Sequence, residues 1–350
     1  MSRVALLTPY SAPVPGGISS FLQGLSRALR SDGCDVSVLS GLGLGDTATN
    51  SNLGTGRHFV ERARKRLAEL RPDILHAHAH WYTLAAAASY VRKNRDAHLV
   101  FSFHTTTVPR WHRWFTQLLR RADVVTCVSG AQLADLRGRL RIAGDLRILR
   151  PATEILDTDP ASQKRFREEH HLRDCFPVLV FAGPLEYSLK VAGVVHLVQS
   201  LRTVLLEYPS AKLLVVGDGS LRQRVISAAE EFGNAVEVTG FIRAPRVALS
   251  VADLYCHISY QEGLPLSVLE AMSLGRCVVA YPAGGLPEVL DGSNGFLVGS
   301  GPEAVGAAIS RLAKDPGARA RAGELARETV VNWYTWEARL PQIRSIYGSA

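Results

Sequence analysis

The feature that most constrains the fold of this chain is the alternation of short apolar runs with longer amphipathic segments along its 350 residues. Apolar runs of roughly four to eight residues are typical of strands buried on both faces of a sheet. Longer segments with helical spacing are typical of the helices that connect parallel strands. The alternation therefore predicts an α/β fold built on parallel sheets.

The first half of the chain contains a continuous series of such strands. We expect them at Val4–Thr8, Val36–Ser40, Ile74–Ala77, Leu99–Phe103, Val124–Val128 and Leu146–Leu149. Helices are expected between them, for example at Ile18–Ser31 and Ser129–Leu140.

The segment Pro151–Gln163 interrupts this pattern, because it lacks periodicity and is rich in Asp, Thr, Pro and Ser. Strands resume at Val178–Ala182, Lys212–Val216, Val236–Thr239, Leu254–His257, Cys277–Tyr281 and Gly295–Val298. We therefore expect two domains, 1–160 and 161–332, connected by this segment.

A C-terminal helix is expected over 333–350, containing Trp333, Tyr334 and Trp336 and packing back toward the first domain. Open parallel sheets bind ligands outside the carboxyl ends of their strands. The cleft between the two domains is therefore where we expect the chemistry.

The amino-acid composition indicates whether the chain folds and in which compartment it is expected. Hydrophobic residues make up 47% of the chain and charged residues 21%, which favours a folded, soluble protein. We find no uninterrupted apolar run of the roughly 20 residues that a spanning helix needs, and the N-terminus reads as a strand. A cytoplasmic location is expected.

The net charge of +8 permits an anionic partner such as nucleic acid, an acidic membrane or a phosphorylated substrate. The basic residues are spread along the chain, without a basic tail or a known nucleic-acid module. No nucleic-acid partner is predicted.

The most specific segment runs from His257 to Val298. Glu262 precedes a Gly-Leu-Pro turn that leads into a helix, and Glu270 lies two helical turns further on. A turn at a helix start presents unpaired backbone N–H groups and the positive end of the helix dipole, which suit phosphate. The two carboxylates suit hydroxyl groups, because each accepts two hydrogen bonds.

The spacing of these glutamates, with the following GGLPEV and DGSNGFLV, resembles family 4 of the retaining glycosyltransferases. Further segments resemble that family in its own order and cover nearly the whole chain: PGGISSFLQGLSRALRSDGCDVSVLS, RPDILHAH, FSFHTT, ADVVTCVSGA, LLVVGDGSLRQRV and VEVTGFI. The resemblance implies the GT-B fold, with two Rossmann-like domains facing a central cleft.

The resemblance also implies roles for particular residues. His104 and Glu262 are implied to be catalytic, with His104 beside the transferring sugar and Glu262 binding it. The implied donor-binding residues are the loop beneath the diphosphate (Gly16, Gly17), the diphosphate contact Lys190, the turn and its backbone N–H groups (Gly263, Leu264, Leu266, Ser267) and the ribose ligand Glu270.

Two positions depart from the family. Pro184 stands where the family usually carries an arginine, so a charge-assisted phosphate contact worth roughly 1.5 to 3 kcal/mol is lost. Lys190 is retained, so either another arginine substitutes or donor binding is weaker. The usual Asn-Gly-Val-Asp hinge is replaced by residues 151–154, Pro-Ala-Thr-Glu.

The implied activity is transfer of a hexose-type sugar, with retention, from a UDP- or GDP-sugar to an acceptor hydroxyl. The acceptor is a small molecule, a lipid or a glycan, and neither a cofactor nor a metal is expected. Two alternatives stay open. One is a GT-B-like sugar-nucleotide epimerase, and the other is a catalytically weakened donor-binding partner subunit, which Pro184 favours.

Two further patterns resemble metal sites. A strand would place His76, His78 and His80 on one face, either as metal ligands or as a wall of the acceptor cleft. Without nearby Cys or carboxylate partners, the cleft wall is favoured. Asp157 and Asp159 form an Asp-x-Asp pair, but their place in the connecting segment favours a solvated hinge.

The segment 109–123 puts aromatic and aliphatic residues near one side with arginines around them. The two sets are Trp111, Trp114, Phe115, Leu118 and Leu119, and Arg110, Arg113, Arg120 and Arg121. Either an ordinary packed helix or an interfacial helix is consistent with this pattern. The second would place the protein peripherally at the inner face of the membrane.

Overall fold

The structure is a computed structural model that describes residues 2–14, 16–104, 112–140, 142, 145–243 and 245–348. The chain divides into two compact units. The first unit contains Met1–Ala152 and Trp336–Ala350, and the second contains Thr153–Thr335. The observed divisions fall at 152/153 and 335/336, where the sequence suggested 160/161 and 332/333.

The first unit is built on a six-stranded parallel sheet with the order β2-β1-β3-β4-β5-β6. Its strands are β1 (Arg3–Tyr10), β2 (Asp35–Leu42), β3 (Ile74–His78), β4 (His98–Ser102), β5 (Val124–Cys127) and β6 (Asp145–Ile148). All six expected strands are confirmed, with ends that differ by a few residues. The chain moves one way from β1 to β2 and the other way from β3 onward, so the strand order reverses between β1 and β3.

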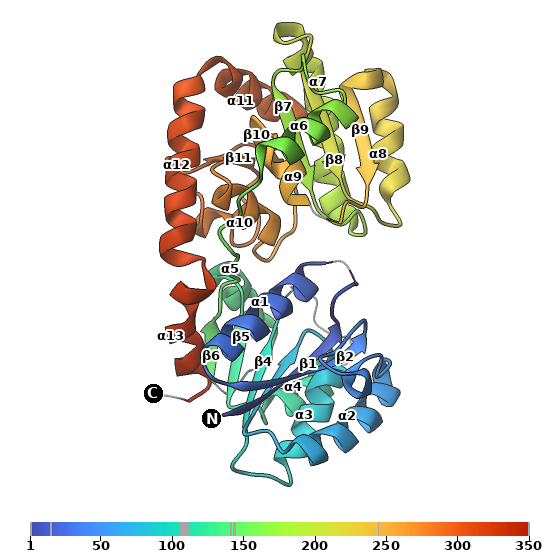
Figure 1. Ribbon diagram of the computed structural model, residues 1–350, viewed down its shortest axis with the longest axis vertical. Helices are drawn as coiled ribbons and strands as arrows, with labels where there is room; N and C mark the ends of the chain where they lie inside the picture. Colours follow the sequence, from blue (N-terminus) through green and yellow to red (C-terminus); the bar gives the residue numbers. More distant parts are fainter. Residues whose placement is uncertain are drawn as a thin grey trace. The chain divides into compact units, whose positions relative to one another are not determined.

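Helices cover both faces of this sheet. They are α1 (Gly17–Ser31), α2 (Gly56–Leu70), α3 (Trp81–Val91), α4 (His112–Leu119), α5 (Gly130–Arg139) and α13 (Trp336–Ile346), with a short 3-10 helix η1 (Ala48–Asn50). Leu75 and Ala77 of β3 pack into the core with α2, α3 and α4. The alternate residues His76 and His78 therefore face the other side, where α1 packs against α13. Figure 1 shows α13 beside β6, where Gln342 donates to the Ile148 carbonyl.

The second unit repeats this plan with the strand order β12-β11-β10-β7-β8-β9, again parallel throughout. Its strands are β7 (Val178–Ala182), β8 (Lys212–Val216), β9 (Val236–Gly240), β10 (Leu254–His257), β11 (Cys277–Ala280) and β12 (Phe296–Leu297). These strands confirm the second expected series. Here the order reverses between β7 and β10, which are neighbours in the sheet.

The second unit has the helices α6 (Pro160–Glu169), α7 (Ser188–Glu207), α8 (Arg222–Ala229), α9 (Pro245–Ser250), α10 (Leu266–Ser273), α11 (Pro302–Lys314) and α12 (Pro316–Trp333), and the 3-10 helices η2 (Glu230–Ala235) and η3 (Leu286–Glu288). Among the described residues, α7 is the one helix long and apolar enough to cross a membrane by length and composition. Half of its most apolar window is buried inside the unit. It contributes Val191, Val194, Leu197 and Val198 to the core, as the central helix of a folded domain does.

Two expectations about the connecting regions were wrong. The segment expected to be irregular through Gln163 becomes helical at Pro160, because the Asp159 side chain accepts from the Ser162 N–H and caps α6. The expected C-terminal helix is also broken. Tyr334 leaves helical geometry at φ −129° and ψ 15°, and its carbonyl accepts from the Thr153 N–H, so α12 ends at Trp333 and α13 begins at Trp336.

Candidate active site

In the second unit, the predicted site residues lie at the point where the strand order reverses. Gly183 follows β7 and leads to Lys190 in the first turn of α7, and Glu262 follows the neighbouring strand β10. In open α/β sheets, ligands bind outside the carboxyl ends of the strands at such a reversal. The topology therefore brings Lys190 and Glu262 together although 71 residues separate them.

Lys190, Glu262 and His257 form a buried cluster at this edge. The Lys190 Nζ lies 3.0 Å from Glu262 Oε1, and the His257 Nε2 lies 3.0 Å from the same oxygen. The three side chains are 10%, 7% and 0% exposed. Among the described residues, no hydrogen bond to the other carboxylate oxygen, Oε2, is found. Glu262 thus keeps one oxygen for a further donor.

Two opposing effects set the charge of Glu262. Burial raises the pKa of its carboxyl, but the Lys190 charge and the hydrogen bonds from His257 and Lys190 outweigh burial and lower the pKa to about 2. The carboxylate therefore stays ionised at neutral pH. An ionised carboxylate in a buried position binds hydroxyl groups strongly.

The backbone around Glu262 is fixed by the Gly284–Gly285 turn. Gly284 has φ +56°, and a Cβ there would lie 2.1 Å from the Glu262 carbonyl oxygen. The Gly285 N–H donates to the Gly263 carbonyl at 2.6 Å. The glycines of the GGLPEV segment therefore let one turn pack directly against the Glu262–Gly263 backbone.

Helix α10 begins just after this turn, with Pro265 at its N-cap position. The N–H groups of Leu266 and Ser267 belong to the first turn and so have no acceptor inside the helix. The Ser267 hydroxyl accepts from the Tyr255 hydroxyl at 2.9 Å. The arrangement presents backbone donors and the positive end of a helix dipole, as a phosphate site does.

Glu270 lies further along α10 without a cationic partner in the described part of the chain. Burial raises the pKa of its carboxyl to about 7. A half-buried carboxyl with no hydrogen-bond donor is costly, and two adjacent hydroxyl groups would satisfy it. This geometry is consistent with the ribose role that the resemblance implies.

Pro184 is exposed on the turn after β7. The Lys190 Nζ lies 3.9 Å from the position that a Cβ on Gly183 would take, so the lysine lies beside this turn. The Lys190 ammonium group carries three hydrogen-bond donors. Lys190 is therefore placed to supply positive charge next to the position where the family's arginine is missing.

In the first unit, the glycine loop lies after β1, at the reversal between β1 and β3. Gly16 is the N-cap of α1 with φ 141° and ψ 160°, a conformation that favours glycine. A Cβ there would meet no atom within 4 Å, so the space beside it is open. Gly16 and Gly17 therefore leave the start of α1 accessible to a ligand.

His104 follows β4 and is held by two neighbours. Its Nε2 lies 3.0 Å from His78 Nδ1, and the Phe21 ring of α1 meets its ring edge-to-face with centroids 5.0 Å apart. Burial lowers the pKa of His104 to about 4. The imidazole is therefore neutral at physiological pH.

The three alternating histidines do not share one environment. His76 and His78 lie in β3 and are fully buried, whereas the strand ends at His78 and the left-handed Ala79 (φ 64°) turns His80 out to an exposed position. The expectation of one common face was wrong at His80. Because His76 and His78 are fully buried, they do not form an exposed wall.

The structure gives Asp157 and Asp159 structural contacts. Asp157 pairs with Arg327 at 3.3 Å, and Asp159 caps α6. Within the described ranges, no group of three or more His, Cys, Asp or Glu side chains is placed to hold a metal ion. That the reaction needs no metal stays a prediction.

The residues that reasoning from sequence missed are His257 and Tyr255. The Tyr255 hydroxyl oxygen lies 3.0 Å from His257 Nδ1, so the pair extends the Glu262 cluster into the sheet. His257 is the last residue of β10 and therefore lies at the ligand-binding edge. The sequence signal that could have identified His257 is its polar side chain at the end of an apolar strand.

The segment 109–123 is described only in part, since Pro109, Arg110 and Trp111 lie outside the described residues. Phe115 and Leu119 are buried in the core of the first unit, as the packed-helix alternative expects. Trp114 is 43% exposed and lies 5.6 Å from the Trp81 ring.

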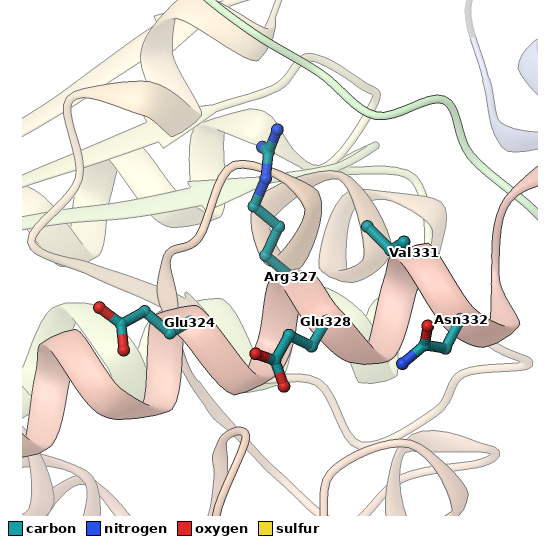
Figure 2. Close-up of a pocket in the computed structure, with 5 residues that line it drawn as sticks. All are labelled: Glu324, Arg327, Glu328, Val331 and Asn332. Carbon is teal, nitrogen blue, oxygen red and sulfur yellow. The ribbon is translucent and has the colours of Figure 1, made fainter.

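A separate pocket lies along α12 (Figure 2). It is lined by Glu324, Arg327, Glu328, Val331 and Asn332. Figure 2 shows Arg327 pointing to the opposite side of the helix from Glu328. The Arg327 guanidinium donates to the Leu156 carbonyl and so secures the connecting segment. The pocket contains none of the predicted site residues.

Two six-stranded parallel sheets, each with one reversal of strand order, form the two Rossmann-like domains of the GT-B fold. A family model described as Glycosyltransferase Family 4 matches residues 15–154, and one described as Glycosyl transferases group 1 matches residues 176–315. The chain belongs to the group 1 glycosyltransferases of family 4, as the sequence motifs indicated.

Similar proteins act on diverse substrates. Sulfoquinovosyl transferase SQD2 of Arabidopsis thaliana is 28% identical over 83% of this chain, which spans only 59% of that relative's length. Phosphatidyl-myo-inositol mannosyltransferase of Mycolicibacterium smegmatis is 26% identical, with 99% of this chain and 93% of the relative covered. The structure of Anabaena HepE in complex with UDP-glucose has a TM-score of 0.80 at 20% identity, with both chains fully covered, and supports the fold.

Proposed function

We propose that the chain transfers a hexose-type sugar from a UDP- or GDP-sugar to an acceptor hydroxyl, with retention of configuration. The observation that carries the proposal is the Lys190–Glu262–His257 cluster at the reversal of the second sheet. It combines a fixed carboxylate for sugar hydroxyls with a cation for a diphosphate. The relatives named for sulfoquinovosyl and mannosyl transfer and the HepE complex with UDP-glucose support a nucleotide-sugar donor.

Different groups of the second unit bind different parts of the donor. The Oε2 of Glu262 accepts from a sugar hydroxyl, and the N–H groups of Leu266 and Ser267 with the Lys190 ammonium bind the diphosphate. The turn at Gly263 and Leu264 lets the donor approach the backbone, and Glu270 accepts from the ribose hydroxyls.

Departure of the diphosphate drives the transfer. The bond between the anomeric carbon and the diphosphate oxygen breaks, and negative charge builds up on the leaving group next to Lys190 and the α10 dipole. Preorganised donors stabilise such developing charge. The acceptor oxygen bonds to the anomeric carbon on the same face, and its proton passes to the departing phosphate oxygen, so no cofactor or metal is needed.

The first unit contributes His104 and the glycine loop. A neutral imidazole binds a sugar hydroxyl without repelling the positive charge that develops on the sugar ring. Gly16 and Gly17 leave backbone N–H groups accessible to the donor diphosphate.

We also propose a cytoplasmic enzyme that contacts the inner face of a membrane. All five cysteines are free thiols, which is consistent with a reducing compartment. Trp81 and Trp114 line a groove with Arg57, Glu61 and Arg64 of α2, so apolar rings lie beside side chains of net positive charge. The relative named for phosphatidyl-myo-inositol supports a lipid acceptor, and sedimentation with anionic but not neutral vesicles tests the contact.

The activity is tested by release of nucleoside diphosphate from UDP-glucose, UDP-GlcNAc and GDP-mannose. Each donor is offered with phosphatidylinositol vesicles, with a free sugar and with water alone. We expect acceptor-dependent release, and an NMR spectrum of the product that shows the anomeric configuration of the donor. An inverted product would exclude the retaining mechanism, and isomerised donor without transfer would favour an epimerase.

A further inference from the structure

The contact between His78 and His104 requires one ring to donate and the other to accept. His78 Nδ1 and His104 Nε2 are 3.0 Å apart. A neutral imidazole carries its proton on one nitrogen only. The pair therefore has two possible arrangements, and each fixes the tautomer of both rings.

The second nitrogen of His78 distinguishes the two arrangements. His78 Nε2 is buried and has no hydrogen-bond partner among the described residues. If His104 donated to His78, the proton of His78 would lie on Nε2 as a buried donor without an acceptor. If His78 donates, Nε2 is a bare acceptor, and an orphaned acceptor is more readily tolerated than an orphaned N–H. The geometry favours His78 as the donor.

This direction determines what His104 offers to a ligand. With Nε2 accepting from His78, the single proton of His104 lies on Nδ1. The Phe21 ring restrains the plane of the imidazole, with rings at 69° to one another. No hydrogen bond from Nδ1 is found within the described part of the chain. His104 therefore presents an N–H donor from a ring whose orientation is fixed.

We propose that His78 is a positioning residue, which holds His104 as the Nδ1–H tautomer so that it donates to a hydroxyl of the transferring sugar. The sugar contact rests on the function proposed above, whereas the tautomer does not. His78 itself does not touch the substrate, because it is fully buried in β3.

His76 provides the internal comparison. Its ring lies beside that of His78 with centroids 4.0 Å apart, but both of its nitrogens have partners. Nδ1 lies 2.9 Å from the Tyr347 hydroxyl and Nε2 lies 2.6 Å from Ser102 Oγ. The Tyr347→Phe variant therefore loosens the same histidine stack at its other end without touching the His78–His104 contact.

The tautomer is read directly by ¹⁵N NMR of histidine-labelled full-length protein, because protonated and bare ring nitrogens resonate far apart. His104 is assigned by comparison with His104→Gln. At pH 7.5 the ring is neutral, since burial lowers its pKa to about 4. We expect a protonated Nδ1 and a bare Nε2 in the wild type. A proton on Nε2 of His104 would overturn the proposal, even if no variant folds.

Two variants of His78 separate positioning from packing. His78→Leu removes the donor, so we expect a mixed tautomer of His104 and a kcat reduced about tenfold with a nearly unchanged donor KM. His78→Asn keeps an amide donor near the Nδ1 position and should restore both the tautomer and most of kcat. Tyr347→Phe should leave both unchanged. An unaltered His104 spectrum in His78→Leu would contradict the proposal.

The NMR spectrum tests the role of His78, and the kinetics test the proposed function, so one claim can be wrong while the other holds. If the wild type shows the Nδ1–H tautomer and His78→Leu loses it, the role of His78 stands whatever the activity. Absence of turnover with every donor would then count against the proposed function alone.

Discussion

The two units differ in how they use their polar groups at equivalent edges of their sheets. The first unit gathers three imidazoles, and burial lowers the pKa values of His76 to about 3 and of His104 to about 4, so they act as neutral groups. The second unit gathers an ionised carboxylate and a lysine, with the pKa of Glu262 lowered to about 2. The same topology thus supports a neutral hydrogen-bonding site in one unit and a charged one in the other.

This difference matches the charges of the nucleotide sugar in the proposed reaction. In that reaction the diphosphate would gain negative charge as it leaves, which the charged cluster of the second unit would compensate. The sugar ring would gain positive charge, which a cationic imidazole would oppose. Each prediction below perturbs one side of this comparison.

The largest effect is expected for Glu262→Ala. The variant removes the sugar-binding carboxylate and leaves the Lys190 ammonium buried without its partner, so we expect kcat/KM to fall by roughly 10² to 10³-fold. Nucleoside diphosphate release measures it. Glu324→Ala removes an exposed carboxylate of the same unit and serves as the control. Equal activity of the two variants would contradict the role of Glu262.

The next effect concerns stability. Lys190→Met should lower the free energy of unfolding by about 3 kcal/mol, because it leaves the Glu262 charge buried with His257 as its remaining partner. Adding Glu262→Gln should recover part of the loss, since the double variant buries no charge. Urea unfolding of the single and double variants measures the coupling. Additive losses would mean that the pair does not interact.

The contributions of His104 and Glu270 to stability should depend on pH with opposite signs. A folded-state pKa of about 4 for His104 means that only the unfolded state binds the proton between pH 6.5 and 4, so stability falls as the pH decreases. Glu270, with a pKa of about 7, keeps its proton when folded, so its contribution falls as the pH rises from 4.5 to 7. Each slope is at most about 1.4 kcal/mol per pH unit.

Thermal unfolding across pH 4 to 8 tests these signs. His104→Gln should flatten the acid side of the profile, and Glu270→Gln should flatten the side toward neutral pH. If both variants flattened the same side of the profile, the opposite signs expected for His104 and Glu270 would be wrong.

The smallest effect is expected for Tyr347→Phe. Loss of its hydrogen bond to His76 should cost about 1 kcal/mol of stability, because a buried partner is left unpaired. Tyr187→Phe, at a tyrosine 55% exposed in the second unit, should have no effect. Calorimetry compares the two, and equal melting temperatures would show that the Tyr347 contact contributes nothing.

The strands could be predicted from the sequence because parallel strands buried on both faces are continuous apolar runs. The motif around Glu262 likewise indicated the charged site, since its residues are close in sequence. The break between α12 and α13 was missed because it depends on the distant Thr153, which binds the Tyr334 carbonyl. His257 was missed for a different reason: the sequence pattern indicates only the end of a buried strand there, although its contact with Glu262 spans only five residues of sequence.

The central claim is that the charged cluster of the second unit binds a nucleotide sugar. Thermal unfolding of the wild type and Glu262→Ala with UDP-glucose, UDP-GlcNAc and GDP-mannose tests it most directly. At about 100 times its dissociation constant, the correct donor should stabilise the wild type by roughly 2.7 kcal/mol, and the variant should lose most of that gain. Absence of stabilisation of the wild type by every donor would contradict the account.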